Sequence, residues 1–221
     1  MENFTDLLGD ITFYLSICLP FIFFIKFRNN GLAYRSFTLY LLVVAIIQVG
    51  MKLYVAHIDP TSNLLFFVYY FVLQFILLSI FYKKLLTFKW VLWVMIGVLI
   101  FIGYQYYKDP QMYFRYNPTG VVVTQSILVL YSLLYFYRQL ITKGKFLIIN
   151  IGLFFYLLSS MLIFSSGNLV FNVDISKEVL SLLTNTNLVL YFIFQILILL
   201  EWYINYSGFN RKNKNGFLNF E

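Results

Sequence analysis

Seven stretches of about 20 mostly apolar residues fill this sequence, each bounded by charged residues, Pro, Gly or Asn. A helix needs roughly 20 apolar residues to cross a hydrocarbon core about 30 Å thick. A membrane-spanning strand would instead show alternation over about 10 residues. We therefore expect an all-α, polytopic bundle of seven transmembrane helices over the ranges Ile11 to Phe27, Phe37 to Ala56, Leu64 to Tyr82, Trp90 to Tyr107, Val121 to Tyr137, Phe146 to Ser165, and Val179 to Tyr203.

The composition excludes most other classes of protein. Only 11% of the 221 residues are charged and 61% are hydrophobic, whereas a soluble domain has about a quarter of its residues charged. The loops are too short for a separate soluble domain, so residues 1–204 form one transmembrane domain followed by a polar tail, 205–221. A single Cys18 and a single His57 leave no disulfide framework and no multi-His or thiolate metal site.

Charge predicts the orientation, because loops on the cytoplasmic side carry an excess of Lys and Arg. With the N-terminus outside and the C-terminus inside, the inner segments hold twelve of the sixteen basic residues. Seven of the nine acids then lie outside, which gives a net charge of +10 inside and −3 outside. The inner basic residues are Lys26, Arg28, Arg35, Lys83, Lys84, Lys89, Arg138, Lys143, Lys145, Arg211, Lys212 and Lys214. As anchors near anionic lipid headgroups, they require no nucleic-acid partner.

Polar residues inside the apolar stretches are the candidate binding residues, since an unsatisfied polar group in hydrocarbon costs several kcal/mol. Two interpretations are open: hydrogen bonds that hold helices together, or a polar cavity that opens to the outer side and binds a small ligand. Lys52 favours the cavity, with Asp10 as its predicted partner, although its side chain can also snorkel outward. The predicted ligand-binding residues in the outer half are Gln48, Lys52, Tyr70, Gln125, Ser159, Asn185 and Asn187.

Catalytic groups are missing from the sequence pattern. It has no pair of intramembrane acids, no metal-ligand spacing and no Gly-rich phosphate loop, so we expect neither an enzyme nor a cofactor. Glu201 ends the last apolar stretch, and we expect it to face water or to pair with Lys83 or Lys84.

A weak internal repeat suggests a three-helix unit used twice. The stretch from Tyr70 to Leu78 aligns with the stretch from Tyr191 to Leu199, which pairs Gln74 with Gln195. Two parallel three-helix units joined by a linking fourth helix give a 3+1+3 arrangement. Its N-terminus and C-terminus lie on opposite sides of the membrane. The SWEET and PQ-loop sugar transporters share that plan, but their Pro-Gln signature is absent, because Phe21 follows Pro20.

The half of the chain from Asn117 onward resembles a group of uncharacterised seven-helix inner-membrane proteins of Gram-negative bacteria. The residues that carry the resemblance are Pro118-Thr119-Gly120, Gln125-Ser126-Ile127-Leu128, Tyr135, Gly152, Tyr156, Ser159, Asn185 and Asn187. A Glu is common in the group where Gln125 stands, so any ion-linked role of that position does not carry over to this chain. Members are often encoded beside sensor histidine kinases, which implies a role in sensing or in an envelope complex.

Together these features predict a non-enzymatic protein of the bacterial inner membrane. It would act in sensing and signalling, or as a membrane subunit of an envelope complex, with a sensor kinase or another envelope membrane protein as partner. The alternative is a small-solute transporter of SWEET-like 3+1+3 arrangement. A third reading, an enzyme acting on lipid, would require a reactive group that the sequence does not offer.

Overall fold

The computed structural model describes residues 2–58, 64–114, 117–142, 144–172 and 177–207. These residues form seven α-helices and a short 3-10 helix, with no strand in the described ranges. The all-α prediction is therefore confirmed. The elements are α1 (Glu2–Phe24), α2 (Leu32–His57), α3 (Leu64–Leu86), α4 (Trp90–Lys108), η1 (Pro110–Phe114), α5 (Pro118–Ile141), α6 (Leu147–Asn172) and α7 (Lys177–Asn205).

Several helices extend beyond the apolar stretches that predicted them. Helix α1 begins at Glu2 rather than at Ile11, because its acidic first turns favour the positive end of the helix dipole. It ends at Phe24, three residues before the predicted Phe27, where the chain enters a series of turns. The start of α5 follows local chemistry closely: Pro118 occupies the first turn, and the Asn117 side chain accepts a hydrogen bond from Gly120 N at 2.9 Å.

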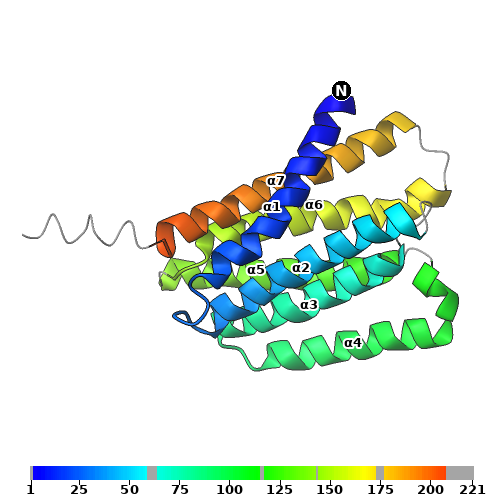
Figure 1. The fold of residues 1–221 in the computed structure, drawn as a ribbon. Helices are drawn as coiled ribbons and strands as arrows, with labels where there is room; N and C mark the ends of the chain where they lie inside the picture. The colour runs from blue at the N-terminus through cyan, green and yellow to red at the C-terminus, as the bar shows by residue number, and fades with distance from the viewer. Residues whose placement is uncertain (1, 59–63, 115–116, 143, 173–176, 208–221) are drawn as a thin grey trace, which may run out of the picture.

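Six of the seven helices close into a ring. In order around the ring, α1 packs on α2, α2 on α3, α3 on α5, α5 on α6, α6 on α7, and α7 returns to α1. Helix α4 lies outside it, against α3 and η1, with only a slight contact to α5 (Figure 1). Exchanging α1 for α5, α2 for α6 and α3 for α7 maps this order of contacts onto itself.

The two ends of the ring differ in chemistry. We call the end at which α1 begins the N end and the opposite end, where α7 finishes, the basic end (Figure 1). The described loops and helix ends at the basic end carry Lys26, Arg28, Arg35, Lys83, Lys84, Lys89, Arg138 and Lys145. Beneath these charges the bundle is filled by buried rings, among them Phe23, Phe37, Phe81, Tyr82 and Tyr131.

The helices have the dimensions that a bilayer demands. All except α6 are long and apolar enough to cross a membrane, by length and composition. In α6 the apolar part whose side chains are described runs over Leu147–Ile163 and is shorter than such a span. Large apolar side chains such as Phe21, Trp93 and Leu140 cover the outside of the bundle, as expected for a surface that faces lipid. The chain thus has the make-up of a multi-pass membrane protein.

Candidate functional site

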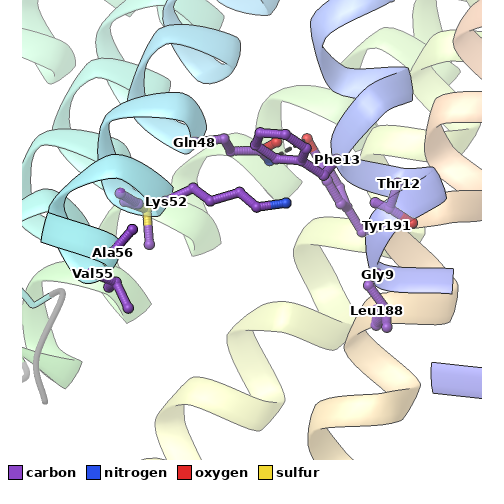
Figure 2. Close-up of a pocket in the computed structure, with 10 residues that line it drawn as sticks. Gly9, Thr12, Phe13, Gln48, Lys52, Val55, Ala56, Leu188 and Tyr191 are labelled. Carbon is purple, nitrogen blue, oxygen red and sulfur yellow. Dashed lines mark hydrogen bonds between the residues drawn. The ribbon is translucent and has the colours of Figure 1, made fainter. Parts of the chain in front are cut away.

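A pocket of about 530 Å³ opens at the N end between α1, α2 and α7 (Figure 2). Gly9, Thr12 and Phe13 line it from α1, while Leu188 and Tyr191 line it from α7; the residues from α2 are Gln48, Met51, Lys52, Val55 and Ala56. This volume lies in the usual range for small-molecule sites, roughly 300–1,000 Å³. Its walls are mostly apolar, and Lys52 is the one charged residue among those that line it.

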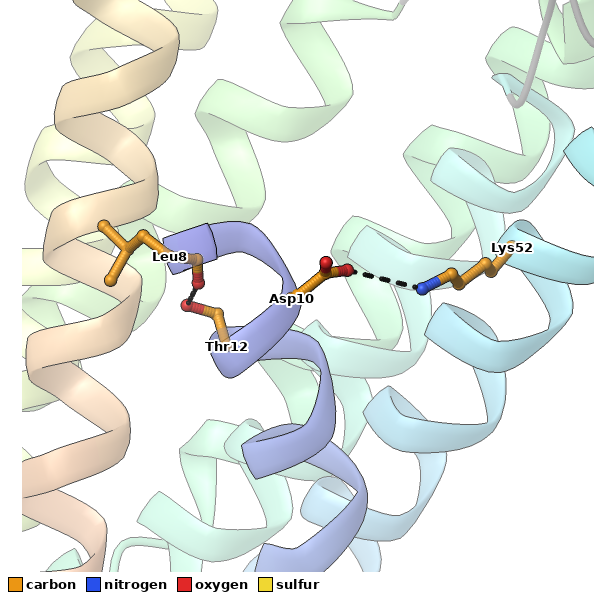
Figure 3. Close-up of polar contacts among 4 residues, drawn as sticks. All are labelled: Leu8, Asp10, Thr12 and Lys52. Carbon is orange, nitrogen blue, oxygen red and sulfur yellow. Dashed lines mark hydrogen bonds and ion pairs between the residues drawn. The ribbon is translucent and has the colours of Figure 1, made fainter. Parts of the chain in front are cut away.

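Lys52 extends from α2 across the pocket towards α1 (Figure 2). Its Nζ atom lies 3.6 Å from Asp10 Oδ1 and 4.3 Å from the centre of the Phe13 ring (Figure 3). The predicted pairing with Asp10 is therefore confirmed. Both side chains stay more than half exposed, at 55% and 65%, and the separation exceeds that of a charge-assisted hydrogen bond, about 2.7–2.9 Å. The ammonium group thus stays over the pocket with hydrogen-bonding capacity to spare.

The floor of the pocket is a hydrogen-bonded junction of the three helices. Gln48 Nε2 donates to the Tyr191 hydroxyl at 3.0 Å, and that hydroxyl shares a 3.3 Å hydrogen bond with Ser16 Oγ. Gln195 Nε2 in turn donates to Ser16 Oγ at 2.6 Å and to the Thr12 carbonyl oxygen at 3.1 Å. A shift of Gln48 or Tyr191 would therefore disturb the hydrogen bonds that join α1, α2 and α7.

A second network lies deeper in the ring and reaches α3 and α6. The hydroxyl groups of Tyr70 and Tyr156 are 3.1 Å apart, and Gln74 Nε2 donates to the Tyr40 hydroxyl at 3.3 Å. The rings of Tyr156 and Tyr191 lie 5.2 Å apart, so the two networks are in contact. Between them, Tyr40 and Tyr191 face a cavity of only about 10 Å³, too small for a solute. Below the pocket the ring is therefore closed.

The structure brings together only part of the predicted ligand-binding set. Gln48 and Lys52 line the pocket, and Tyr70 belongs to the deeper network. Gln125 instead joins α5 to α6, where its Nε2 donates to Ser160 Oγ at 3.3 Å. Ser159 is half-buried on α6, outside the residues that line the pocket.

Asn185 and Asn187 lie on α7 but are likewise absent from the pocket lining, which on that helix consists of Leu188 and Tyr191. Asn185 Nδ2 donates to Ser181 Oγ at 3.3 Å within the same helix. The Asn187 Oδ1 atom is buried without a hydrogen-bond partner among the described residues. A role of either residue in ligand binding stays a prediction.

The sequence did not predict Phe13 or three of the four tyrosines of these networks. A Tyr within an apolar stretch resembles any other large core residue, so Tyr40, Tyr156 and Tyr191 were not predicted as site residues. A signal was available for Tyr191, because the internal alignment pairs it with Tyr70 four residues before the paired glutamines. Phe13 gave no such signal, since its importance comes from the approach of Lys52 on another helix.

Glu201 corrects a prediction at the basic end. Rather than facing water or pairing with Lys83 or Lys84, it is fully buried at the start of α6. Its carboxylate accepts hydrogen bonds from Phe146 N at 2.7 Å, from Ile148 N at 3.1 Å, and from Asn205 Nδ2 at 2.7 Å. It thereby caps a helix N-terminus whose N–H groups would otherwise lack partners.

Phe146 and Tyr206 lie beside this cap, and both are compatible with a carboxylate there. Phe146 has φ 74°, in the left-handed region that non-glycine residues rarely adopt, and the bond to Glu201 holds it there. Burial, with a smaller contribution from the Glu201 carboxylate, raises the pKa of the nearby Tyr206. The Tyr206 hydroxyl accordingly stays neutral beside the acid. The hydrogen bonds of Glu201 give it a structural role as the cap of α6.

A second pocket, of about 490 Å³, lies between α3, α4 and η1. Within the described ranges, no group of three or more His, Cys, Asp or Glu side chains is close enough to hold a metal ion. In comparisons with known proteins, no family model, no curated protein and no solved structure matches the chain.

Proposed function

We propose that this chain is a non-enzymatic inner-membrane protein that binds a small ligand in the N-end pocket and acts in sensing. In this proposal seven helices cross the bilayer, with the N end outside and the basic end in the cytoplasm. The described charges support that orientation, because the loops at the basic end are rich in Lys and Arg. The described part of the N end carries five acids, Glu2, Asp6, Asp10, Asp109 and Glu178, against three lysines, Lys52, Lys108 and Lys177.

The observation that carries the proposal is a pocket at the N end whose inner side is closed. Its floor is closed by the junction of Gln48, Tyr191 and Ser16, and the bundle below is packed with aromatic rings. A solute that enters from the outer side can therefore bind but meets no open path onward. This geometry suits recognition of a ligand better than its passage.

The hydrogen bonds below the pocket supply a route for a response. A ligand that moves Gln48 or Tyr191 perturbs the contacts of α7 with α1 and, through Tyr156, with α6. Helix α7 ends at the basic end, next to the cap that Glu201 forms on α6. We propose that a shift of α7 changes the basic face and is read there by a sensor kinase or another envelope membrane protein.

Filling the pocket tests the proposal. The Leu188→Trp variant places a large ring in the pocket, whereas Val189→Trp, one residue along on an exposed position of α7, is the matched control. Purified protein in nanodiscs would be screened with small metabolites for ligands that raise its melting temperature. We expect ligands that stabilise the wild type and Val189→Trp but not Leu188→Trp. Equal stabilisation of all three proteins by every ligand found, or no ligand at all, would defeat the proposal.

A second candidate is a small-solute transporter, which the order of helix contacts favours. The exchange of α1, α2 and α3 for α5, α6 and α7 preserves the ring of contacts, with α4 outside as the linker. The alignment also places Gln74 and Gln195 at related points of the two networks. Proteoliposomes loaded with a ligand from the screen would separate the two functions: transport predicts counterflow of labelled ligand, and a pure sensor predicts none.

A further inference from the structure

We infer that the N-end pocket recognises an amphipathic monocarboxylate, with the carboxylate at Lys52 and a compact apolar body between α1, α2 and α7. This inference rests on the proposed function, because it names the ligand class of the same pocket. It is carried by the distribution of charge and of free hydrogen-bonding groups around the cavity.

Each polar side chain of the floor already makes a hydrogen bond within the protein. The Gln48 amide donates to Tyr191, the Tyr191 hydroxyl is shared with Ser16, and the Thr12 hydroxyl donates to the Leu8 carbonyl oxygen at 2.6 Å. A sugar or another ligand with many hydroxyl groups would find few donors and acceptors there, and it would lose the hydrogen bonds it makes to water. The polar part of the ligand must therefore bind to another group of the pocket.

Lys52 is the lining residue with the most unused hydrogen-bond donors. Its ammonium has three donors, no hydrogen bond to another described residue is recorded for it, and its contact with Asp10 is a loose 3.6 Å ion pair. The Phe13 ring at 4.3 Å holds the ammonium above the cavity (Figure 2). A carboxylate that enters the pocket can accept hydrogen bonds from this ammonium without displacing a buried interaction.

Asp10 limits the charge of the ligand. Lys52 and Asp10 together are neutral, so a monoanion adds one negative charge to the pair, and a dianion such as a phosphate monoester adds nearly two. The second charge would lie close to the Asp10 carboxylate with no further cation among the lining residues. A cationic ligand is disfavoured for a parallel reason, because Lys52 repels it and no acid is among the described residues that line the cavity.

The apolar residues that line the pocket determine the size of the ligand's apolar part. Phe13, Met51, Val55 and Leu188 present an apolar wall, and about 530 Å³ accommodates a body the size of a phenylalkyl group or a medium acyl chain. Such a ligand can come from solution, as an aryl or branched carboxylate, or from the bilayer, as a fatty acid. Both share a carboxylate head on an apolar body.

The experiment compares three probes of the same shape, 4-phenylbutyrate, 4-phenylbutyramide and 4-phenylbutylamine, by calorimetry on the full chain in neutral nanodiscs. We expect the carboxylate to bind at least tenfold more tightly than the amide, and the amine not to bind. Dodecanoate in a parallel titration identifies the source: binding of dodecanoate without 4-phenylbutyrate points to a lipid-derived ligand, and the reverse points to a soluble one.

Variants of the ion pair sharpen the test. Lys52→Met should weaken carboxylate binding at least tenfold, and Lys108→Met, which removes an exposed lysine of α4 at the same end, should leave it unchanged. Asp10→Asn should tighten carboxylate binding several-fold because it removes the competing anion, an effect that loss of structure would not produce.

Two outcomes separate this inference from the proposed function. If the screen finds ligands that depend on Leu188 but bind equally as acid and amide, or prefer a cation, the monocarboxylate inference is wrong and the sensing pocket stands. If no ligand depends on Leu188, both fail.

Discussion

The cap that Glu201 forms on α6 predicts a large effect from a single substitution. Replacing Glu201 with Leu removes the acceptor for Phe146 N, Ile148 N and Asn205 Nδ2 at a site with no exposed surface. A hydrogen bond to a charged group contributes about 1.5–3 kcal/mol, and an unsatisfied buried donor costs about 1–3 kcal/mol. With the two backbone donors left unpaired, we expect a loss of about 3–5 kcal/mol.

Thermal unfolding in detergent, followed by size-exclusion chromatography, would measure this loss. For a chain of this size 1 kcal/mol corresponds to roughly 2–4 °C, so the melting temperature of Glu201→Leu should fall by about 6–20 °C. Asn205→Ala removes only the third donor, from an exposed side chain, and should lower it by no more than about 4 °C. A Glu201→Leu protein that melts within 2 °C of the wild type would refute the capping argument.

Three further predictions concern topology and packing. In a background without the native cysteine, Asp6→Cys should react with a membrane-impermeant maleimide on intact cells, and Lys84→Cys should react only after permeabilisation; the opposite pattern would invert the proposed orientation. Gly152→Ala should destabilise the protein by about 1–3 kcal/mol, because its Cβ would lie 2.7 Å from a buried ring, whereas Gly103→Ala has open space and should be neutral in the same melting assay. Gln195→Leu should lower stability by less than about 1 kcal/mol, since interhelical hydrogen bonds in membranes average about 0.6 kcal/mol and this side chain leaves its own Oε1 unpaired; a loss above 3 kcal/mol would contradict this.

The helices were predictable because apolar length is a strong signal. The bilayer fixes how many apolar residues a span needs, so each of the seven apolar stretches coincides with a described helix. The ends were less predictable: the residues before Ile11 are polar enough to resemble a loop, yet they continue α1 to Glu2. Helix formation there depends on local backbone preferences and on the dipole, and hydropathy does not report either.

The site was predictable only in part, because hydropathy says nothing about which face of a helix meets which neighbour. Lys52 and Asp10 could be paired from depth alone, since both are charged and lie near the same end. Glu201 could not be placed in this way. A carboxylate at the end of an apolar stretch resembles a surface charge, and only the return of the chain at Phe146 brings two backbone N–H groups to it.

The ring of contacts is more symmetric than the side chains within it, and this difference explains why the pocket opens where it does. At the pair α5 and α6, Gln125 donates to Ser160 Oγ at 3.3 Å and Ser126 donates to Met161 Sδ at 3.0 Å, so the two helices are tied together. Helices α1 and α2 hold the corresponding place in the ring, but near the N end their described polar contact is the loose pair of Lys52 and Asp10. Helix α1 also runs at a visible tilt to its neighbours (Figure 1). The looser of these two helix pairs, α1 and α2, is the one that lines the pocket.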